Sequence, residues 1–516
     1  MLVRHRTESI SKSAAQDLTF VIKHPLIPMA HKSKSTALIV KTMGVFSGVQ
    51  VISILVSVVR TKLVAIWIGA VGVGLFGVFN TVLDLLGNFA QMGMNTVAAR
   101  ELAAHEEHSQ RVRYILMVRR ICLSLGLLFA LLTIGFSPLL SRWAFGDGGM
   151  TWWFCLLSVA IFAMAVSGGE GGILMGLHKL KGIALATTWG NVIGLAVTVP
   201  LFYFWRATAI VPSIVILWVI TTSIMWHYAH KATRDILSVG CKGITWRSSM
   251  TDGFHIIKLG FYIIISIMMI NLGSYLFLVY LNRTADTATV GYFQSGFTLI
   301  NRYVGLVFAA LMVDFFPRLS MCQRSRRAMS ATVSQELGVI MGVMIPLVLL
   351  FIAFVPVIIE VLYTRDFQII QPMVYMGIIG TVFRALSCTM AYVMLARADG
   401  LVYMAVEVAS AAVYVGASIL CFNLWGIPGM GIAYIIWYVV YTAVVGTLYR
   451  LRYGLKLSGA ILKLSAWAVV AAVGSCALVM LSDGALIAHC AVGLAGVITA
   501  IIILPKLIGR KKKKCI

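Results

Sequence analysis

Long apolar runs follow one another along almost the whole chain, and no polar block large enough for a soluble domain separates them. A helix needs about 20 mostly apolar residues to cross about 30 Å of hydrocarbon. Only 12% of the 516 residues are charged and 60% are apolar, whereas soluble proteins average about 25% charged residues. The sequence therefore predicts one all-α polytopic membrane domain and excludes a soluble protein.

Fourteen apolar segments have the length of a spanning helix. Their approximate bounds are 37–59, 72–98, 120–141, 152–177, 183–205, 209–229, 259–281, 290–316, 337–361, 371–396, 401–422, 428–449, 460–482 and 484–504. The first six and the next six resemble a duplication, because a shift of 217 positions places Val73-Gly74-Leu75-Phe76 on Val290-Gly291-Tyr292-Phe293. We expect two pseudo-symmetric six-helix bundles and two further C-terminal helices around a central cavity.

This organisation divides the chain into six parts. They are a basic cytoplasmic arm (1–36), an N-terminal six-helix bundle (37–230), a cytoplasmic linker (231–258), a C-terminal six-helix bundle (259–449), two extra spans (450–505) and a basic cytoplasmic tail (506–516).

The charge is strongly positive, with 42 Lys and Arg against 18 Asp and Glu. A nucleic-acid partner is one explanation, and the concentration of Lys and Arg in cytoplasmic loops is the other. With both termini cytoplasmic, 33 basic residues fall in cytoplasmic loops and six in the opposite loops, leaving three within spans. The charge therefore indicates topology, and we expect no nucleic-acid partner; the basic tail would contact anionic headgroups.

Two spans carry a polar face. The residues concerned are Asn80, Asp84, Asn88, Gln91 and Asn95 in the second span and Tyr403, Glu407, Ser410 and Tyr414 in the eleventh. Spacings of three and four place each set on one side of a helix. Such a stripe either hydrogen-bonds to neighbouring helices or forms the wall of a hydrated cavity, and we favour the cavity.

The three basic residues within spans are Lys41, Arg302 and Arg384. A central Arg costs about 2.5–3.5 kcal/mol on insertion scales, so it should face the interior of a bundle. An ion pair with Asp84 or Glu407 is one explanation for either arginine, and a site for an anionic substrate is the one we prefer. Lys41 lies near the cytoplasmic end, where it can snorkel.

Other patterns predict no enzyme chemistry. Gly72–Gly77 spells GxGxxG but opens a membrane span, so a dinucleotide site is not indicated. The nine cysteines form no CxxC pair, and no metal site or disulfide scaffold is expected. No Walker A sequence or nucleophile elbow is present. Glu170 lies within a cluster of four glycines and is either a coupling group or a hydrogen-bonded partner.

Several stretches resemble the polysaccharide branch of the multidrug/oligosaccharidyl-lipid/polysaccharide (MOP) exporter superfamily, in particular Wzx-type flippases. They are Gly74-Leu75-Phe76 leading into residues 91–95 and Arg100, residues 291–294 through 316–320, and residues 396–398 through 403–408. The resemblance covers nearly the whole chain after residue 36.

This resemblance implies a flippase of the bacterial inner membrane. Its substrate would be an undecaprenyl-diphosphate-linked oligosaccharide, moved from the cytoplasmic to the periplasmic leaflet by alternating access for O-antigen, common-antigen, capsule or exopolysaccharide synthesis. Polymerase and chain-length proteins of the pathway would be its partners, and no cofactor is expected beyond a coupling proton or sodium ion.

The resemblance also implies roles for single residues. Arg302, Arg384 and Lys41 would bind the diphosphate, and Glu407 and Asp84 would couple transport to the cation. The helical spacing adds Asn80, Asn88, Gln91 and Gln294 as residues of the substrate path, and Glu170 in its glycine cluster is a further coupling candidate.

Three alternatives remain. A lipid II flippase would carry a related lipid-linked substrate. A multidrug/cation antiporter is less favoured, because such proteins usually have twelve spans and acidic binding groups. A membrane-embedded glycosyltransferase or polymerase would need long periplasmic loops, which this chain lacks.

Overall fold

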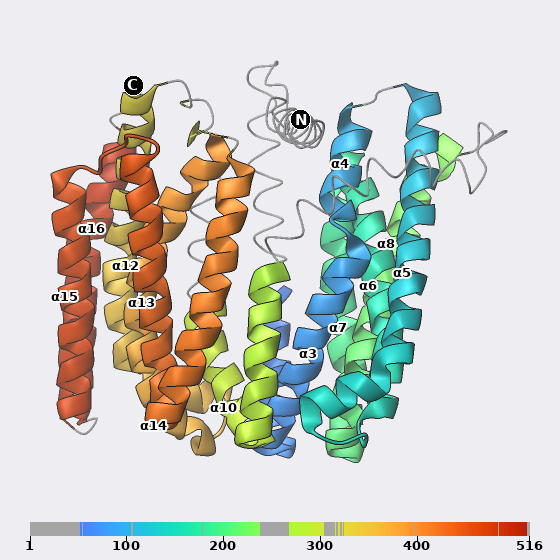
Figure 1. Cartoon of the computed structure of the whole chain (residues 1–516), viewed down its shortest axis with the longest axis horizontal. Coiled ribbons are helices and arrows are strands. Elements are labelled where there is room, and N and C mark those ends of the chain that lie inside the picture. The colour runs from blue at the N-terminus through green and yellow to red at the C-terminus, as the bar shows by residue number, and fades with distance from the viewer. Residues whose placement is uncertain are drawn as a thin grey trace, which may run out of the picture. The chain divides into compact units, whose positions relative to one another are not determined.

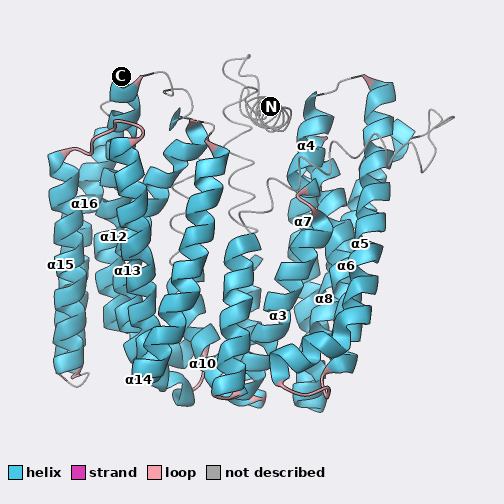
Figure 2. Cartoon of the chain, viewed as in Figure 1, coloured by secondary structure: helices cyan, strands magenta, loops and turns pink. Residues whose placement is uncertain are grey.

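The computed structural model describes residues 52–237, 268–303 and 325–512, apart from positions 54, 105, 106, 178, 398, 483 and 484 within these ranges, together with positions 315, 318, 319 and 322. These residues form helices and turns, and none of them lies in a strand (Figure 2). The prediction of an all-α fold is confirmed.

The chain packs as two compact units. Described residues up to Tyr292, with Leu362–Thr364, form the N-terminal unit, and the other residues from Phe293 onward form the C-terminal unit. The linker predicted at 231–258 falls mostly outside the described residues, so its role stays a prediction.

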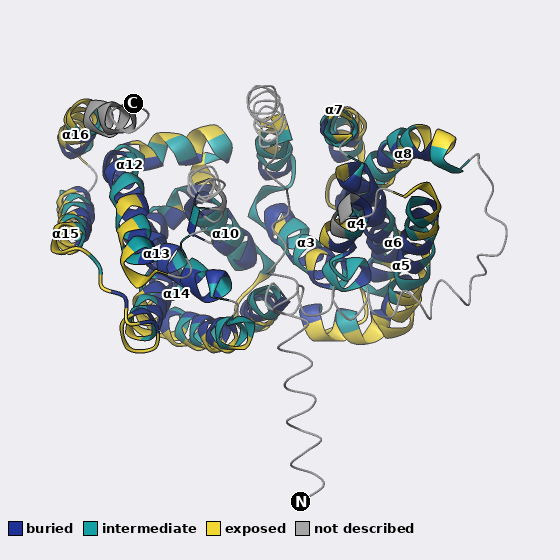
Figure 3. Cartoon of the chain, turned by 90° about the horizontal axis from the view of Figure 1, so that it is seen from above, coloured by how far each residue is buried: buried dark blue, intermediate teal, exposed yellow. Residues whose placement is uncertain are grey.

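Five long helices and two short ones build most of the N-terminal unit. They are α3 (Gly69–Gln91), α4 (Met94–Ala104), α5 (His108–Phe145), α6 (Thr151–Gly176), α7 (Leu180–Trp205), η1 (Arg206–Ala209) and α8 (Ile210–Leu237). The central helix is α6, which packs against α3, α4, α5 and α8 (Figure 3). Small residues permit this packing, because a Cβ at Gly169 would lie 2.5 Å from Cys122 Sγ. The glycine cluster around Glu170 therefore allows close helix approach, and α6 continues through it without a break.

The long helices of the C-terminal unit lie side by side (Figure 1). They are α10 (Thr287–Thr298), which crosses from the other unit, η2 (Leu299–Tyr303), α12 (Arg326–Leu362), η3 (Arg365–Ile370), α13 (Gln371–Ala396), α14 (Gly400–Leu451), α15 (Gly459–Leu481) and α16 (Leu486–Lys512). The extensive packing of α13 on α14 forms the interior, while α15 and α16 have the lowest buried fractions of the described spans.

Nine described helices are long and apolar enough to span a membrane. Two of them reverse direction. The helix over Leu180–Leu237 is interrupted by η1, and α14 contains Gly426 at φ 63° and ψ −139°. The described residues thus supply eleven crossings, and the predicted spans 37–59, 259–281 and 290–316 lie wholly or partly outside them. The count of fourteen stays a prediction.

The second predicted span, 72–98, falls within residues Gly69–Ala99, which are long and apolar enough to cross a membrane. It consists of two helices, because α3 ends at Gln91 and α4 begins at Met94. Met92 (φ 45°) and Gly93 (φ 65°) between them adopt left-handed conformations. The helix is therefore interrupted within the predicted polar stripe, between Gln91 and Asn95, and the side chains of both residues approach the glycine cluster of α6.

Glycines of the two proposed repeats meet at the start of α3 and α10. A Cβ added to Gly74 would collide with the carbonyl oxygen of Thr287 and would lie 3.0 Å from the backbone nitrogen of Gly291. A Cβ added to Gly291 would in turn collide with the carbonyl of Ala70. The GxGxxG segment therefore serves close backbone packing.

Candidate functional site

Arg384 is the intramembrane cation that the structure describes most fully. Its half-buried guanidinium lies on α13, and its Nη1 donates to both Asn301 oxygens, at 3.3 Å for the carbonyl. The same nitrogen lies 3.4 Å from the Tyr434 hydroxyl, which is 3.3 Å from Asn301 Oδ1. The Tyr438 ring centroid is 5.9 Å from Cζ. An amide, a phenol and an aromatic face therefore hold the guanidinium in place.

Asn301 reaches Arg384 from η2, the π-helical turn that also contains Arg302. π-Helical turns occur frequently at functional sites because they redirect side chains within a helix. The side chain of Arg302 lies outside the description, as does Lys41 altogether. Their predicted contacts with a diphosphate, and any pairing of Arg302 with a carboxylate, stay predictions.

Glu407 occupies a buried position on the first segment of α14, with 6% of its surface exposed. Its Oε1 accepts a hydrogen bond of 2.6 Å from the Tyr441 hydroxyl. Further along the stripe, the Trp437 indole donates to Ser410 Oγ at 2.7 Å. The kink at Gly426 folds α14 back, so the polar stripe of its first segment faces its second segment.

Four aromatic side chains lie between Arg384 and Glu407. Tyr434, Trp437, Tyr438 and Tyr441, which we call the aromatic row, lie on one face of the second segment of α14. Ring centroids are 4.8 Å apart for Tyr434 and Tyr438 and 4.4 Å for Trp437 and Tyr438. The row contacts Arg384 at one end and Glu407 at the other. Sequence reasoning missed it, although spacings of three, one and three indicate a single helical face.

The polar residues of α3 occupy a different kind of environment. Asp84 is exposed, and Asn80, Asn88 and Gln91 are half-buried. Asn80 Nδ2 donates to the carbonyl of Phe76 in its own helix at 2.7 Å. Gln91 packs against Gly168 of α6, where an added Cβ would lie 2.8 Å from its side chain. Asp84 belongs to the N-terminal unit, whereas Arg384, Glu407 and the half-buried Gln294 belong to the C-terminal unit.

Glu170 forms an ion pair that sequence reasoning did not identify. Arg119 on α5 donates to both carboxylate oxygens, at 2.7 and 2.9 Å, and its Nη2 lies 3.2 Å from Thr233 Oγ1 on α8. The Glu170 side chain is 4% exposed. A buried carboxylate needs such a partner. The bidentate contact joins α5 to α6, and the hydrogen bond to Thr233 adds α8. Arg119 lies 51 positions from Glu170, so no local pattern signals the pair.

The described residues contain no group of three or more His, Cys, Asp or Glu side chains placed to hold a metal ion. The site instead offers a cation, hydroxyl groups, aromatic faces and a buried carboxylate.

Comparison with known proteins adds a family and a fold. Residues 71–372 match the model of a family described as polysaccharide biosynthesis protein. The fold is similar to that of the lipid II flippase MurJ in an inward closed conformation, with a TM-score of 0.69 and 14% identity over 90% of this chain and 99% of that one. No curated protein sequence gave a significant match.

Two other solved structures share the fold. An inward-facing multidrug resistance MATE family transporter of the MOP superfamily gives a TM-score of 0.62 at 14% identity, covering 80% of this chain and 96% of that one. A MOP superfamily transporter from Pyrococcus furiosus, described as having a binding pocket of reversed polarity, gives 0.56 at 14% identity with the same coverage.

Proposed function

The chain belongs to the polysaccharide biosynthesis protein family, and from this premise we propose that it is a flippase for a lipid-linked oligosaccharide. Its substrate is an undecaprenyl-diphosphate-linked repeat unit, which it moves from the cytoplasmic to the periplasmic leaflet by alternating access. The product serves the synthesis of a surface polysaccharide such as O-antigen, common antigen, capsule or exopolysaccharide. The transporter folds that the chain resembles support movement of a substrate across a membrane.

The arrangement of Arg384 on the aromatic row carries this proposal. A guanidinium binds phosphate oxygens through parallel hydrogen bonds, and the phenol hydroxyls of Tyr434 and Tyr438 supply further polar groups beside it. Aromatic rings with polar tips offer both an apolar face and a hydrogen bond, which suits sugars. The polyprenyl chain would stay in lipid throughout.

A coupling cation is part of the proposal. Glu407 is the carboxylate that we assign to it first, because it is buried at the end of the aromatic row. An intramembrane carboxylate is expensive unless it is paired or used. Asp84 and Glu170 are secondary assignments; Glu170 would first have to leave Arg119. The coupling ion is a proton or sodium.

Transport of a defined substrate tests the function. The full chain is reconstituted into liposomes that carry fluorescent undecaprenyl-diphosphate oligosaccharide in one leaflet, and an impermeant quencher reports movement. We expect flipping above the rate of protein-free liposomes, and an Arg384→Ala variant should lose it. Arg365→Ala is the matched control, because Arg365 is an exposed arginine of the same unit that pairs with Glu360.

A lipid II flippase is the second candidate, favoured by the likeness to MurJ over 90% of the chain. Liposomes carrying fluorescent lipid II in place of the oligosaccharide separate the two. Movement of lipid II alone would replace the proposed substrate, and movement of a cationic drug alone would indicate an antiporter.

We further propose that the protein resides in the bacterial inner membrane with both termini in the cytoplasm. Within each unit, the turns on one side carry most of the basic residues. The polymerase and chain-length proteins of the same pathway would act on its product.

A further inference from the structure

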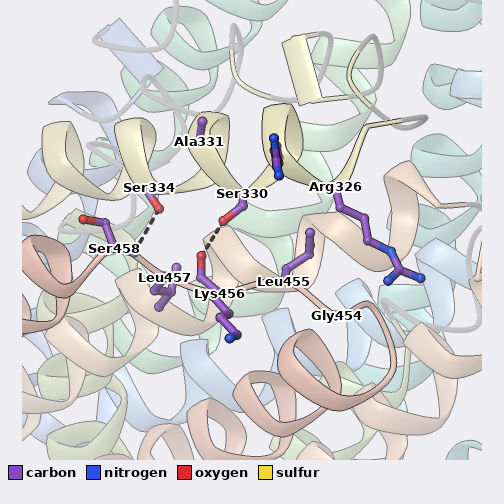
Figure 4. A pocket seen from close by; sticks show the side chains of 10 residues that line it. Arg326, Ser330, Ala331, Ser334, Gly454, Leu455, Lys456, Leu457 and Ser458 are labelled. Atoms are coloured by element: carbon purple, nitrogen blue, oxygen red, sulfur yellow. Dashed lines mark hydrogen bonds between the residues drawn. The ribbon is translucent and has the colours of Figure 1, made fainter.

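An open cavity of about 420 Å³ lies at one end of the C-terminal unit. The first turns of α12 form one wall, and the loop that joins α14 to α15 forms the other (Figure 4). The polar side chains that line it are Arg326, Arg327, Ser330, Ser334, Lys456 and Ser458. Small-molecule sites commonly occupy about 300–1,000 Å³, so the cavity can accept a polar headgroup.

The lining is basic. Arg326, Arg327 and Lys456 form no ion pair with any residue that the structure describes, and none of the described lining residues is acidic. Neighbouring basic residues do have partners. Arg452 pairs with Asp399 at 3.3 Å, and Arg318 pairs with Glu336 at 2.6 Å. The local carboxylates are therefore engaged elsewhere, and three positive charges remain around the cavity.

Two hydrogen bonds fix the walls. Ser330 Oγ on α12 donates to the Lys456 carbonyl, and the Ser458 backbone N–H donates to Ser334 Oγ at 3.4 Å. Figure 4 shows both hydroxyls pointing from α12 to the loop. Arg326, the first residue of α12, and Ser458, the residue before α15, both line the cavity, so the N-terminus of each helix borders it. Helix N-termini carry partial positive charge and favour anions.

The cavity lies where hydrocarbon is expected to end. Its α12 wall precedes the apolar segment 337–361, and its loop wall precedes the segment 460–482. Apolar side chains next to the loop are open to the surroundings, with Leu451 78% and Leu462 55% exposed. A headgroup bound in the cavity would therefore have apolar protein surface beside it for its acyl or prenyl chain.

We propose that this cavity binds the phosphate group of an anionic lipid. Basic side chains at the membrane surface attract such headgroups, and here a preformed cavity, two helix N-termini and apolar flanks add to that attraction. The site is separate from the Arg384 cluster and does not depend on the proposed transport function.

Lipid binding by the delipidated full-length protein tests the site. Native mass spectrometry compares phosphatidylglycerol, undecaprenyl diphosphate and phosphatidylcholine, with inorganic phosphate as a competitor. We expect the two anionic lipids to bind more tightly than phosphatidylcholine. The double variant Arg326→Gln, Lys456→Gln should weaken them about tenfold through the loss of charge-assisted contacts. The Lys456 carbonyl that anchors Ser330 is untouched by this change.

The matched control is the double variant Arg450→Gln, Lys463→Gln. It removes two exposed positive charges near the same end, neither of which lines the cavity. Unchanged lipid affinity in this control supports a specific site, whereas equal weakening in both double variants would overturn it.

The remaining outcomes also decide. Preference for phosphatidylglycerol or for undecaprenyl diphosphate distinguishes a bulk lipid from a substrate-like one, and either supports the site. Equal binding of phosphatidylcholine, or displacement of the lipids by inorganic phosphate at matched concentration, contradicts a lipid-phosphate site. Because no transport is measured, failure here leaves the flippase proposal standing, and failure of flipping leaves this site standing.

Discussion

Arg384 illustrates how a single residue in a span is stabilised. A charged side chain at mid-membrane costs about 2.5–3.5 kcal/mol on insertion scales. Its contacts with Asn301, Tyr434 and Tyr438 replace part of the hydration that the guanidinium loses. Cation–π contacts contribute about 2 kcal/mol when desolvated. These contacts hold the charge beside the aromatic row.

Substitution of Arg384 should separate substrate binding from folding. Arg384→Lys keeps the charge but loses the planar fork, so flipping should fall by about tenfold. Arg384→Ala should abolish it while the protein reaches the membrane at normal level. The measurements are polysaccharide export in cells and membrane abundance by immunoblot.

A purely structural role of Arg384 predicts a different result. If Arg384 only holds Asn301 and Tyr434 together, then the alanine variant should be depleted from the membrane. Wild-type export from a well-expressed double variant Arg302→Ala, Arg384→Ala would contradict the anion site.

Glu407 should respond to neutralisation if it couples transport to a cation. Glu407→Gln should remove the dependence of flipping on an ion gradient while keeping the shape of the site, and Asp84→Asn should have the smaller effect. Tyr441→Phe is the companion variant, since it deletes the 2.6 Å hydrogen bond to the carboxylate but keeps the ring. Flipping in proteoliposomes is compared with and without proton and sodium gradients. Unchanged gradient dependence in both neutralised variants would make these carboxylates structural.

Sequence reasoning identified single residues better than their partners. The cost of a charge in hydrocarbon singled out Arg384, and helical spacing singled out the stripe with Glu407, because both arguments need only local information. Asn301 lies 83 positions from Arg384, and Tyr441 lies 34 from Glu407. Such contacts arise from the path of the chain, which periodicity does not determine.

At the scale of elements, breaks in helices decide which faces meet. The break at Met92 and Gly93 ends the stripe of α3, and the kink at Gly426 turns α14 back on itself. Mean hydropathy does not reveal either break, because Gly69–Ala99 and Gly400–Leu451 are each apolar enough to cross a membrane, as an uninterrupted span is. The repeat alignment nevertheless predicted equivalent positions for Gly74 and Gly291, and the structure shows these two glycines in contact.

Enlarging either glycine should therefore destabilise the N-terminal unit. Gly74→Leu and Gly291→Ala place atoms where a backbone carbonyl already lies, and overpacking costs about 1–3 kcal/mol or more. Thermal unfolding in detergent should shift downward for both variants. Gly135→Ala and Gly474→Ala are the controls, because no atom lies within 4 Å of an added Cβ there. Equal unfolding temperatures of the test and control variants would contradict this prediction, because they would show that the helices can move apart without loss of stability.

At the scale of the whole molecule, charge placement argues for orientation. In the N-terminal unit, the start of α5, the turn from α6 to α7 and the end of α8 lie on one side and carry many basic residues. The end of α5 lies on the other side, where Arg283 donates to the Trp143 carbonyl at 2.8 Å. This asymmetry can be predicted from the sequence because it is a sum of the charges in each loop. Contacts between helices cannot be summed in this way, since they join residues that are far apart in the chain.

Reporter fusions test the orientation. The positive-inside rule places residues 282–289 in the periplasm, because this turn lies on the side with few basic residues, and places the basic tail after the last span in the cytoplasm. Alkaline phosphatase is active only in a compartment where its disulfides form, such as the periplasm. It should therefore be active when inserted between Ala285 and Asp286 and inactive when fused after Lys514. A cytoplasmic fluorescent reporter should give the opposite pattern at the same positions. Active phosphatase after Lys514, together with inactive phosphatase in the 282–289 turn, would show the opposite orientation. The basic cavity of α12 and Lys456 would then lie in the periplasm, and the proposed direction of transport would be reversed.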